Sequence, residues 1–134
     1  MPADITVTEI FARIYGLYLL AAGIGLIADR ALYTRAVAEF RDSPALVLLG
    51  GIAAFLIGAA TVSLHNVWTG WPAILISLIG WIALIEGLLY IAARPLMTRL
   101  IARLSIPPSV ATAIGIVVAL IGLALLWAGF AGTA

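Results

Sequence analysis

Residues 27–35 read IADRALYTR, and residues 91–99 read IAARPLMTR. The likeness extends in both directions, so that residues 14–64 lie over residues 78–128 without a gap, and 17 of these 51 positions are identical. Apolar composition alone does not align glycine, arginine and proline in one register. The matches of that kind are Gly16/Gly80, Gly23/Gly87, Gly51/Gly115, Gly58/Gly122, Arg30/Arg94, Arg35/Arg99 and Pro44/Pro108. The sequence therefore predicts one structural unit used twice.

The composition is that of a membrane protein. Of the 134 residues, 65% are hydrophobic and only 10% are charged, with a mean hydropathy of +1.24, whereas a soluble domain carries about 25% charged residues. About 20 apolar residues cross a bilayer as a helix. The sequence has four such runs, at Ile10–Ala28, Ala45–Leu64, Pro72–Ala93 and Val110–Ala131. We therefore predict an all-α membrane protein with four transmembrane helices in a single domain, residues 1–134.

A basic segment lies between the two apolar runs of each repeat. In Asp29–Ser43 and Ala93–Ser105, apolar residues recur at helical spacing and the arginines lie largely off that stripe. Amphipathic helices of this kind lie in the membrane interface. Ser43 and Pro44 suit the N-cap and the first position of the helix that follows. Each repeat is thus predicted to be a helix, an interfacial helix and a second helix.

The arginines predict the orientation. Six of the seven lie in the two basic segments, and the connector between the repeats, residues 65–71, has none. By the positive-inside rule the basic segments are cytoplasmic, and both termini and the connector are outside. Both repeats then start outside, so they are parallel and related by a pseudo-two-fold axis along the membrane normal. The acidic N-terminus argues against a cleaved signal peptide.

Arg13 is the exception, and an i,i+4 pair with Glu9 and snorkelling to the outer surface would explain it. The other basic residues and two tryptophans are candidates for contact with lipid headgroups. They are Arg30, Arg35, Arg94, Arg99, Arg103, Trp68 and Trp71. Each arginine could bind anionic lipid with about 1 kcal/mol, although topology alone explains these arginines equally well.

Glycine recurs at seven-residue spacing on every apolar run, which keeps it on one helix face. Small residues let membrane helices approach closely, because water provides no driving force between helices inside lipid. We therefore predict helix packing at Gly16, Gly23, Gly51, Gly58, Gly80, Gly87, Gly115, Gly122 and Gly129.

Glu86 stands alone in the third apolar run, roughly 10 Å inside the apolar layer. A carboxylate at this depth costs on the order of 3 kcal/mol, so it is a candidate functional site. One interpretation is a proton or cation relay, with Tyr90, Tyr18 and His65 as further candidates. The other is a protonated side chain that hydrogen-bonds to Tyr90 or Tyr18 and joins two helices.

His65 is the only histidine. It could form a proton or metal contact at the outer face, or a site shared across an oligomer axis; otherwise it belongs to an interfacial turn anchored by Trp68 and Trp71. One histidine cannot supply two axial haem ligands, and a chain without lysine cannot form a retinal Schiff base. We expect no cofactor, no metal, no nucleic-acid partner and no enzymatic activity, because no nucleophile or phosphate-binding motif is present.

The sequence HNVW at residues 65–68, followed by LIGWIAL at residues 78–84 and by Gly87, resembles small uncharacterised bacterial four-span membrane proteins with an HNVW…GWxAL pattern. RIYGLY at residues 13–18 and DSPA at residues 42–45 are also similar, so the resemblance covers about residues 10–92. It implies a location in the bacterial inner membrane and no particular activity. In those proteins lysine is frequent at the position of Glu86, so the resemblance does not imply an acidic relay.

Two functional hypotheses remain. The first is a non-enzymatic accessory or scaffold subunit that packs with itself or with partner membrane proteins in a larger complex. The second is a small oligomeric transporter or channel that uses Glu86 as its coupling site. We favour the first, because a transport path normally needs more than one polar lining residue.

Overall fold

The computed structural model describes residues 4–103 and 107–134, and its regular structure there is entirely helical. The helices are α1 (Val7–Ala28), α2 (Arg30–Asp42), α3 (Pro44–Leu64), α4 (Trp71–Ala92), α5 (Arg94–Arg103) and α6 (Pro108–Ala131). Four of them, α1, α3, α4 and α6, are long and apolar enough to cross a membrane. The predicted all-α fold with four candidate spans is confirmed, and each span begins and ends within three residues of its predicted bounds. Residues 104 and 105, at the end of the second basic segment, lie outside the described residues.

Single residues form the corners between α1, α2 and α3. Asp29 ends α1 by donating its N–H to Gly25 O (2.9 Å), and its carboxylate accepts from Leu32 N (3.0 Å) at the start of α2. Ser43 does the same at the next corner, where its Oγ accepts from Leu46 N (3.3 Å) and Pro44 occupies the first turn of α3. The predicted cap at Ser43 is confirmed. Because no loop intervenes, α2 is held across the ends of α1 and α3.

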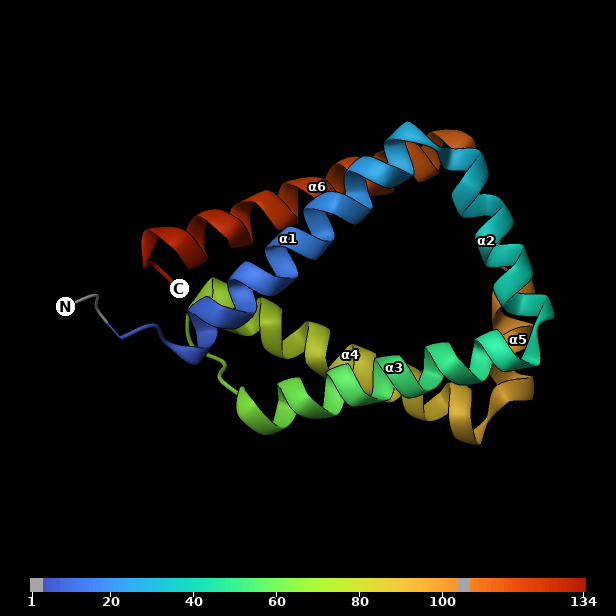
Figure 1. Cartoon of the computed structure of the whole chain (residues 1–134), viewed down its shortest axis with the longest axis horizontal. Helices are drawn as coiled ribbons and strands as arrows, with labels where there is room; N and C mark the ends of the chain where they lie inside the picture. Colours follow the sequence, from blue (N-terminus) through green and yellow to red (C-terminus); the bar gives the residue numbers. More distant parts are fainter. Residues whose placement is uncertain (1–3, 104–106) are drawn as a thin grey trace.

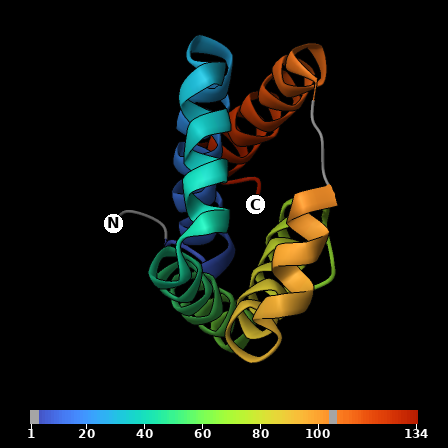
Figure 2. The ribbon, with the colours of Figure 1, turned by 90° about the vertical axis from the view of Figure 1, so that its right-hand side faces the viewer.

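The long helices form two pairs, α1 with α6 and α3 with α4 (Figure 1). The pairs converge at the end of the molecule that carries both chain termini and diverge toward the other end. There α2 runs from α1 to α3, and α5 lies on the opposite side, next to α4 (Figure 2). The long helices therefore form a V whose open end is bridged by α2, and no residue of α2 or α5 is buried.

Each pair is packed through glycine. The eight predicted packing glycines of the 14–64 and 78–128 repeats are all buried. A Cβ added at Gly23 on α1 would lie 2.5 Å from Ala119 N and 2.6 Å from Gly115 O on α6. At such distances the two backbones leave no room for any side chain. The seam of α1 and α6 therefore depends on glycine itself and not only on small residues.

The same contacts occur in the second pair, displaced by 64 residues. A Cβ at Gly87 would meet Phe55 N and Gly51 O on α3. At the 64-residue offset, Gly87 corresponds to Gly23, Phe55 to Ala119 and Gly51 to Gly115, so the two contacts are equivalent. Gly16 and Gly80 also make equivalent contacts. Gly16 faces Gly122 O and Leu126, and Gly80 faces Thr61 and Val62. Val62 is the position that corresponds to Leu126 at the 64-residue offset.

Arg13 does not pair with Glu9, so that prediction is wrong. Its Nε donates to Gly129 O (3.1 Å) and its guanidinium lies 4.5 Å from the centre of the Phe130 ring, both near the end of α6. Glu9 is used instead in a capping box with Thr6, whose Oγ1 accepts from Glu9 N (3.1 Å). A cation next to the last carbonyls of a helix is favourable, so Arg13 fixes α6 to α1.

We expect Gly87→Ala to lower the free energy of unfolding by about 1–3 kcal/mol, the usual cost of overpacking, because the new Cβ would collide with the backbone of α3. Unfolding in detergent by titration with a denaturing detergent measures this change. Gly25→Ala is the matched control on α1, since its Cβ would meet only the end of the Tyr33 side chain, at 2.9 Å. Equal stability of the two variants would contradict the glycine seam.

Candidate functional site

Buried polar side chains gather where the two helix pairs converge. This polar junction consists of Thr8 and Tyr15 of α1, Thr61 of α3, His65 after α3, and Ser77 of α4. Only 2% of His65 and 1% of Thr61 and Ser77 is exposed. An unpaired polar group at such burial costs about 1–3 kcal/mol, so the junction depends on every hydrogen bond being made.

The hydrogen bonds assign the tautomer of His65. Ser77 Oγ donates its one hydrogen to Val67 O (2.8 Å) and accepts from Val67 N (3.2 Å). A serine hydroxyl has a single hydrogen, so toward His65 Nδ1, at 3.3 Å, Ser77 Oγ acts as an acceptor. His65 Nδ1 therefore carries the hydrogen, and Nε2 accepts from Thr8 Oγ1 (2.9 Å).

A second chain of hydrogen bonds lies beside the first. Thr61 Oγ1 donates to Ile57 O (2.7 Å), so it accepts from the hydroxyl of Tyr15 at 2.6 Å. The Phe11 ring stands between the two chains, with its centre 6.0 Å from that of Tyr15 and 5.9 Å from that of His65. The junction thus joins α1 of one pair to α3 and α4 of the other.

The junction leaves His65 no free nitrogen. Both ring nitrogens have hydrogen-bond partners, and binding a metal or releasing a proton to the surface would break one of these bonds. Within residues 4–103 and 107–134, no group of three or more His, Cys, Asp or Glu could hold a metal ion. Chemically, the arrangement is suited to fixing the angle of the V.

The tryptophans of the connector are exposed at this end of the molecule. Trp68 and Trp71 present about half of their surfaces. Asn66 Oδ1 accepts from Trp68 Nε1 (2.9 Å) and from Trp81 Nε1 (3.3 Å). The indole N–H groups of Trp68 and Trp81 are therefore bound by Asn66, while about half of the surface of Trp68 and of Trp71 remains exposed.

Glu86 does not join these groups. Its side chain is exposed on α4 and makes no hydrogen bond with the described residues. Tyr90, one turn later, is buried with its ring against Phe40, at 5.4 Å between centres, whereas Tyr18 is 66% exposed. Ser77, the partner of His65, precedes Glu86 by nine residues, about 14 Å along the helix. Among the described residues no hydrogen bond joins the four proton-relay candidates, which lie at the junction (His65), on α4 (Glu86 and Tyr90) and on the exposed surface of α1 (Tyr18).

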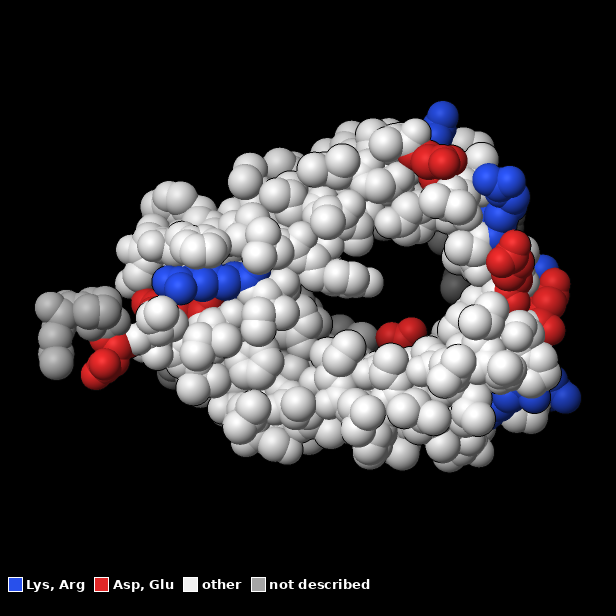
Figure 3. All heavy atoms as spheres, viewed as in Figure 1, with Lys and Arg blue, Asp and Glu red and all other residues white. Residues whose placement is uncertain are grey.

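A cavity of about 630 Å³ lies under α2, in the gap between the helix pairs. Its lining comes from five helices and contains two arginines and no acidic residue. The lining residues are Leu26, Arg30, Tyr33, Thr34, Val37, Ala38, Phe40, Arg41, Tyr90, Ile101, Ala111 and Ile114. Figure 3 shows charged atoms gathered at the two ends of the molecule, near α2 on one side and near the N-terminus on the other, with mostly uncharged atoms between them and one acidic group at the edge of the central opening.

The two arginines of the cavity lie at opposite ends of α2. Arg30 Nη1 donates to Pro108 O (3.2 Å) and to Thr112 Oγ1 (3.1 Å) at the start of α6. Arg41 Nε lies 3.4 Å from the Asp42 carboxylate. The other predicted headgroup residues, Arg35, Arg94, Arg99 and Arg103, are all exposed.

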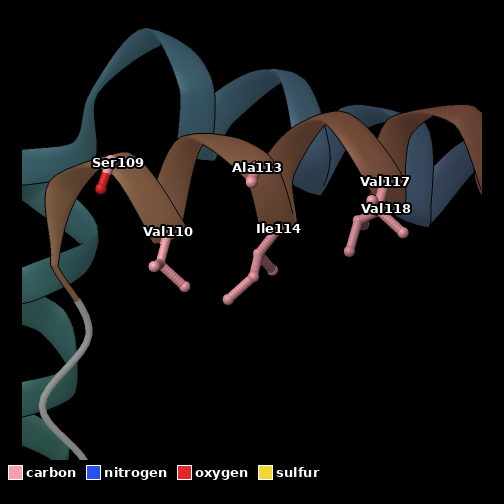
Figure 4. A pocket seen from close by; sticks show the side chains of 6 residues that line it. All are labelled: Ser109, Val110, Ala113, Ile114, Val117 and Val118. Carbon is pink, nitrogen blue, oxygen red and sulfur yellow. The ribbon is translucent and has the colours of Figure 1, made fainter.

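A second hollow, of about 380 Å³, runs along one face of α6. Its lining residues are Ser109, Val110, Ala113, Ile114, Val117 and Val118, and the larger of these side chains project together from the helix (Figure 4). Ile114 also lines the cavity under α2, so the two hollows adjoin.

Sequence reasoning did not find Thr8, Tyr15, Thr61 or Ser77. These residues are scattered over three helices, and isolated Ser, Thr and Tyr are common in membrane helices. A single sequence carries no signal that joins them.

The chain gives no match to protein-family models, to curated proteins or to solved structures. The resemblance to small bacterial four-span membrane proteins stays a prediction.

We expect Ser77→Ala to lower the free energy of unfolding by about 1–3 kcal/mol, because it leaves the buried His65 Nδ1 and the part-buried N–H and carbonyl of Val67 without their partner. Ser63→Ala on the exposed face of α3 is the matched control. Thermal unfolding in detergent, followed by tryptophan fluorescence, compares them. A Ser77→Ala variant as stable as the control would mean that the junction does not stabilise the fold.

Proposed function

We propose that this chain is a bacterial inner-membrane protein without catalytic activity, which acts as an accessory or scaffold subunit. It packs with copies of itself or with partner membrane proteins in a larger complex. The chain contains four apolar helices compatible with an integral membrane protein, and the rest of this proposal is supported by their surface.

The observation that carries the proposal is the uncovered surface of the spans. Each span packs mainly against one other span, so the V leaves most of every helix outside any contact within the chain. Large apolar side chains are exposed on all four, among them Leu17, Leu56, Ile82 and Leu120. Lipid covers such a surface in part, and helices of another subunit can cover it in the same way, since membrane helices associate by close packing.

The proposal includes a tandem duplication with parallel repeats. It is supported by the 17 identical positions and by the glycine contacts, which recur at the 64-residue offset in both pairs. Residues 14–64 and 78–128 would then be related by a pseudo-two-fold axis along the membrane normal. Each helix pair combines one helix from each repeat, so neither repeat would form a packed unit alone.

The proposed orientation places both termini and the connector outside, with α2 and α5 at the cytoplasmic surface. The chain has no cysteine, so single cysteines can be introduced in intact cells. We expect Thr69→Cys to react with a membrane-impermeant maleimide, and Arg35→Cys and Arg99→Cys to react only after lysis. The reverse pattern would contradict the proposed orientation.

A second function, transport of protons or cations, is favoured by one observation. Glu86 is exposed on α4, outside the glycine seam, with no hydrogen bond to the described residues. In an oligomer such a side chain could face a polar path between subunits. Only one acidic residue lies at that depth, which is why we rank this function second.

One experiment separates the two functions. We expect the protein purified in mild detergent to have the mass of a complex, by light scattering or native mass spectrometry. Glu86→Gln should keep this mass and the thermal midpoint, and vesicles with either protein should show the same low proton flux. A strictly monomeric protein would contradict the scaffold proposal, and a pH-dependent flux that Glu86→Gln abolishes would replace it by transport.

A further inference from the structure

We propose that the cavity under α2 is a binding site for one anionic phospholipid of the surrounding bilayer. Its phosphate lies at Arg30 and one acyl chain fills the cavity between the helix pairs. The inference rests on the proposed membrane placement but goes beyond the scaffold function, since it assigns a ligand and a site to this chain.

The first argument is charge. Arginine binds phosphate through its planar fork of N–H donors. Arg30 and Arg41 line the cavity, and no acidic residue does. The two side chains are not equivalent, because Arg41 lies 3.4 Å from the Asp42 carboxylate and is therefore partly neutralised. Arg30 has no acidic partner within 4.0 Å among the described residues, so it retains the stronger attraction for an anion.

The second argument is that Arg30 is held in position. Nη1 donates to Pro108 O and Thr112 Oγ1 on α6, while Nε and Nη2 make no hydrogen bond with the residues that the structure describes. A guanidinium fixed on one side, with donors left on the other, binds a phosphate without first losing much conformational freedom. The same hydrogen bonds hold the guanidinium where α1, α2 and α6 meet.

The third argument is the shape and polarity of the rest of the cavity. Apart from Arg30, Arg41, Thr34 and two tyrosines, its lining is apolar and consists of Leu26, Val37, Ala38, Phe40, Ile101, Ala111 and Ile114. Its volume of about 630 Å³ lies within the range of about 300–1,000 Å³ that is typical of small-molecule sites. An apolar space that begins at a cation matches a molecule with one anionic end and an apolar chain.

The fourth argument is the direction in which the chain would run. Arg30 lies beside the start of α6, whereas Tyr90 packs against Phe40 at the other end of α2. Arg30 and Phe40 are ten residues apart, about 15 Å. Acidic residues lie near both ends, since Asp29 directly precedes Arg30 and caps Leu32 N (3.0 Å), and Glu86 lies one turn before Tyr90 on α4. The headgroup is assigned to the Arg30 end because Arg30 has no acidic partner within 4.0 Å among the described residues, whereas Arg41 at the other end lies 3.4 Å from Asp42.

Native mass spectrometry of the full chain, titrated with dioleoyl phosphatidylglycerol, tests the site. We expect Arg30→Gln to weaken binding of the first lipid about tenfold, Arg41→Gln to weaken it less, and Arg35→Gln, the matched control on the same helix, to leave it unchanged. Phosphatidylcholine should bind more weakly than phosphatidylglycerol. Equal losses for Arg30→Gln and Arg35→Gln, or equal binding of the two lipids, would overturn the proposal in favour of general surface attraction.

Further variants separate binding in the cavity from a general loss of charge or structure. Ala38→Phe fills the cavity without changing charge and should weaken binding, whereas Ala36→Phe, an exposed position on the same helix outside the lining, should not. Thr112→Val removes one of the two hydrogen bonds that hold Arg30 but keeps its charge, and should weaken binding less than Arg30→Gln does. If Ala38→Phe binds normally, or if Thr112→Val binds as weakly as Arg30→Gln, the proposed site is wrong.

The same spectra test whether the site binds a phospholipid or free phosphate, and whether the protein forms a complex. Inorganic phosphate at equal concentration should not displace the lipid, because it lacks the chain; displacement would show that the apolar cavity is not used. The mass of the complex is read independently of lipid occupancy. Loss of lipid binding in a protein that remains assembled would contradict this site alone, and loss of assembly would contradict the scaffold proposal.

Discussion

The architecture depends on the close approach of two pairs of helix backbones at glycine. Inside lipid, apolar side chains gain little by leaving one apolar environment for another, so helices associate where their backbones can come near. Gly23 against Gly115 and Gly87 against Gly51 provide that approach in the two pairs. Once α1 is joined to α6 and α3 to α4 in this way, the positions that α2 and α5 can take are restricted.

The two ends of the V are held by different means. At the end with the chain termini, a buried polar junction around His65 joins the pairs, and its hydrogen bonds lie in an apolar setting where they are strong. At the other end the pairs are spread apart, α2 runs from one pair to the other, and α5 lies next to α4. A cavity with arginine in its wall follows from this difference, because α2 brings its charged residues over an apolar gap.

Positions that the 64-residue offset aligns differ in chemistry at the end with the chain termini. Arg13 contacts Gly129 in the first pair, and the positions 64 residues away, Ser77 and His65, contact each other in the second. The same place in each pair therefore carries an arginine bound to a helix end in one case and a hydrogen bond between serine and histidine in the other. Only the second arrangement also reaches across to Thr8 of the other pair.

The sequence by itself determined the number, length and polarity of the helices, because these depend on local composition and on caps such as Ser43. It also identified the glycines, whose period places them on one face. Which spans pair was decided by the tertiary structure, because a glycine face fits any other glycine face and the period does not name its partner. The polar junction, the use of Arg13 on Gly129 instead of Glu9, and the cavity beside Arg30 likewise depend on residues far apart in the chain, which only the packed helices bring together.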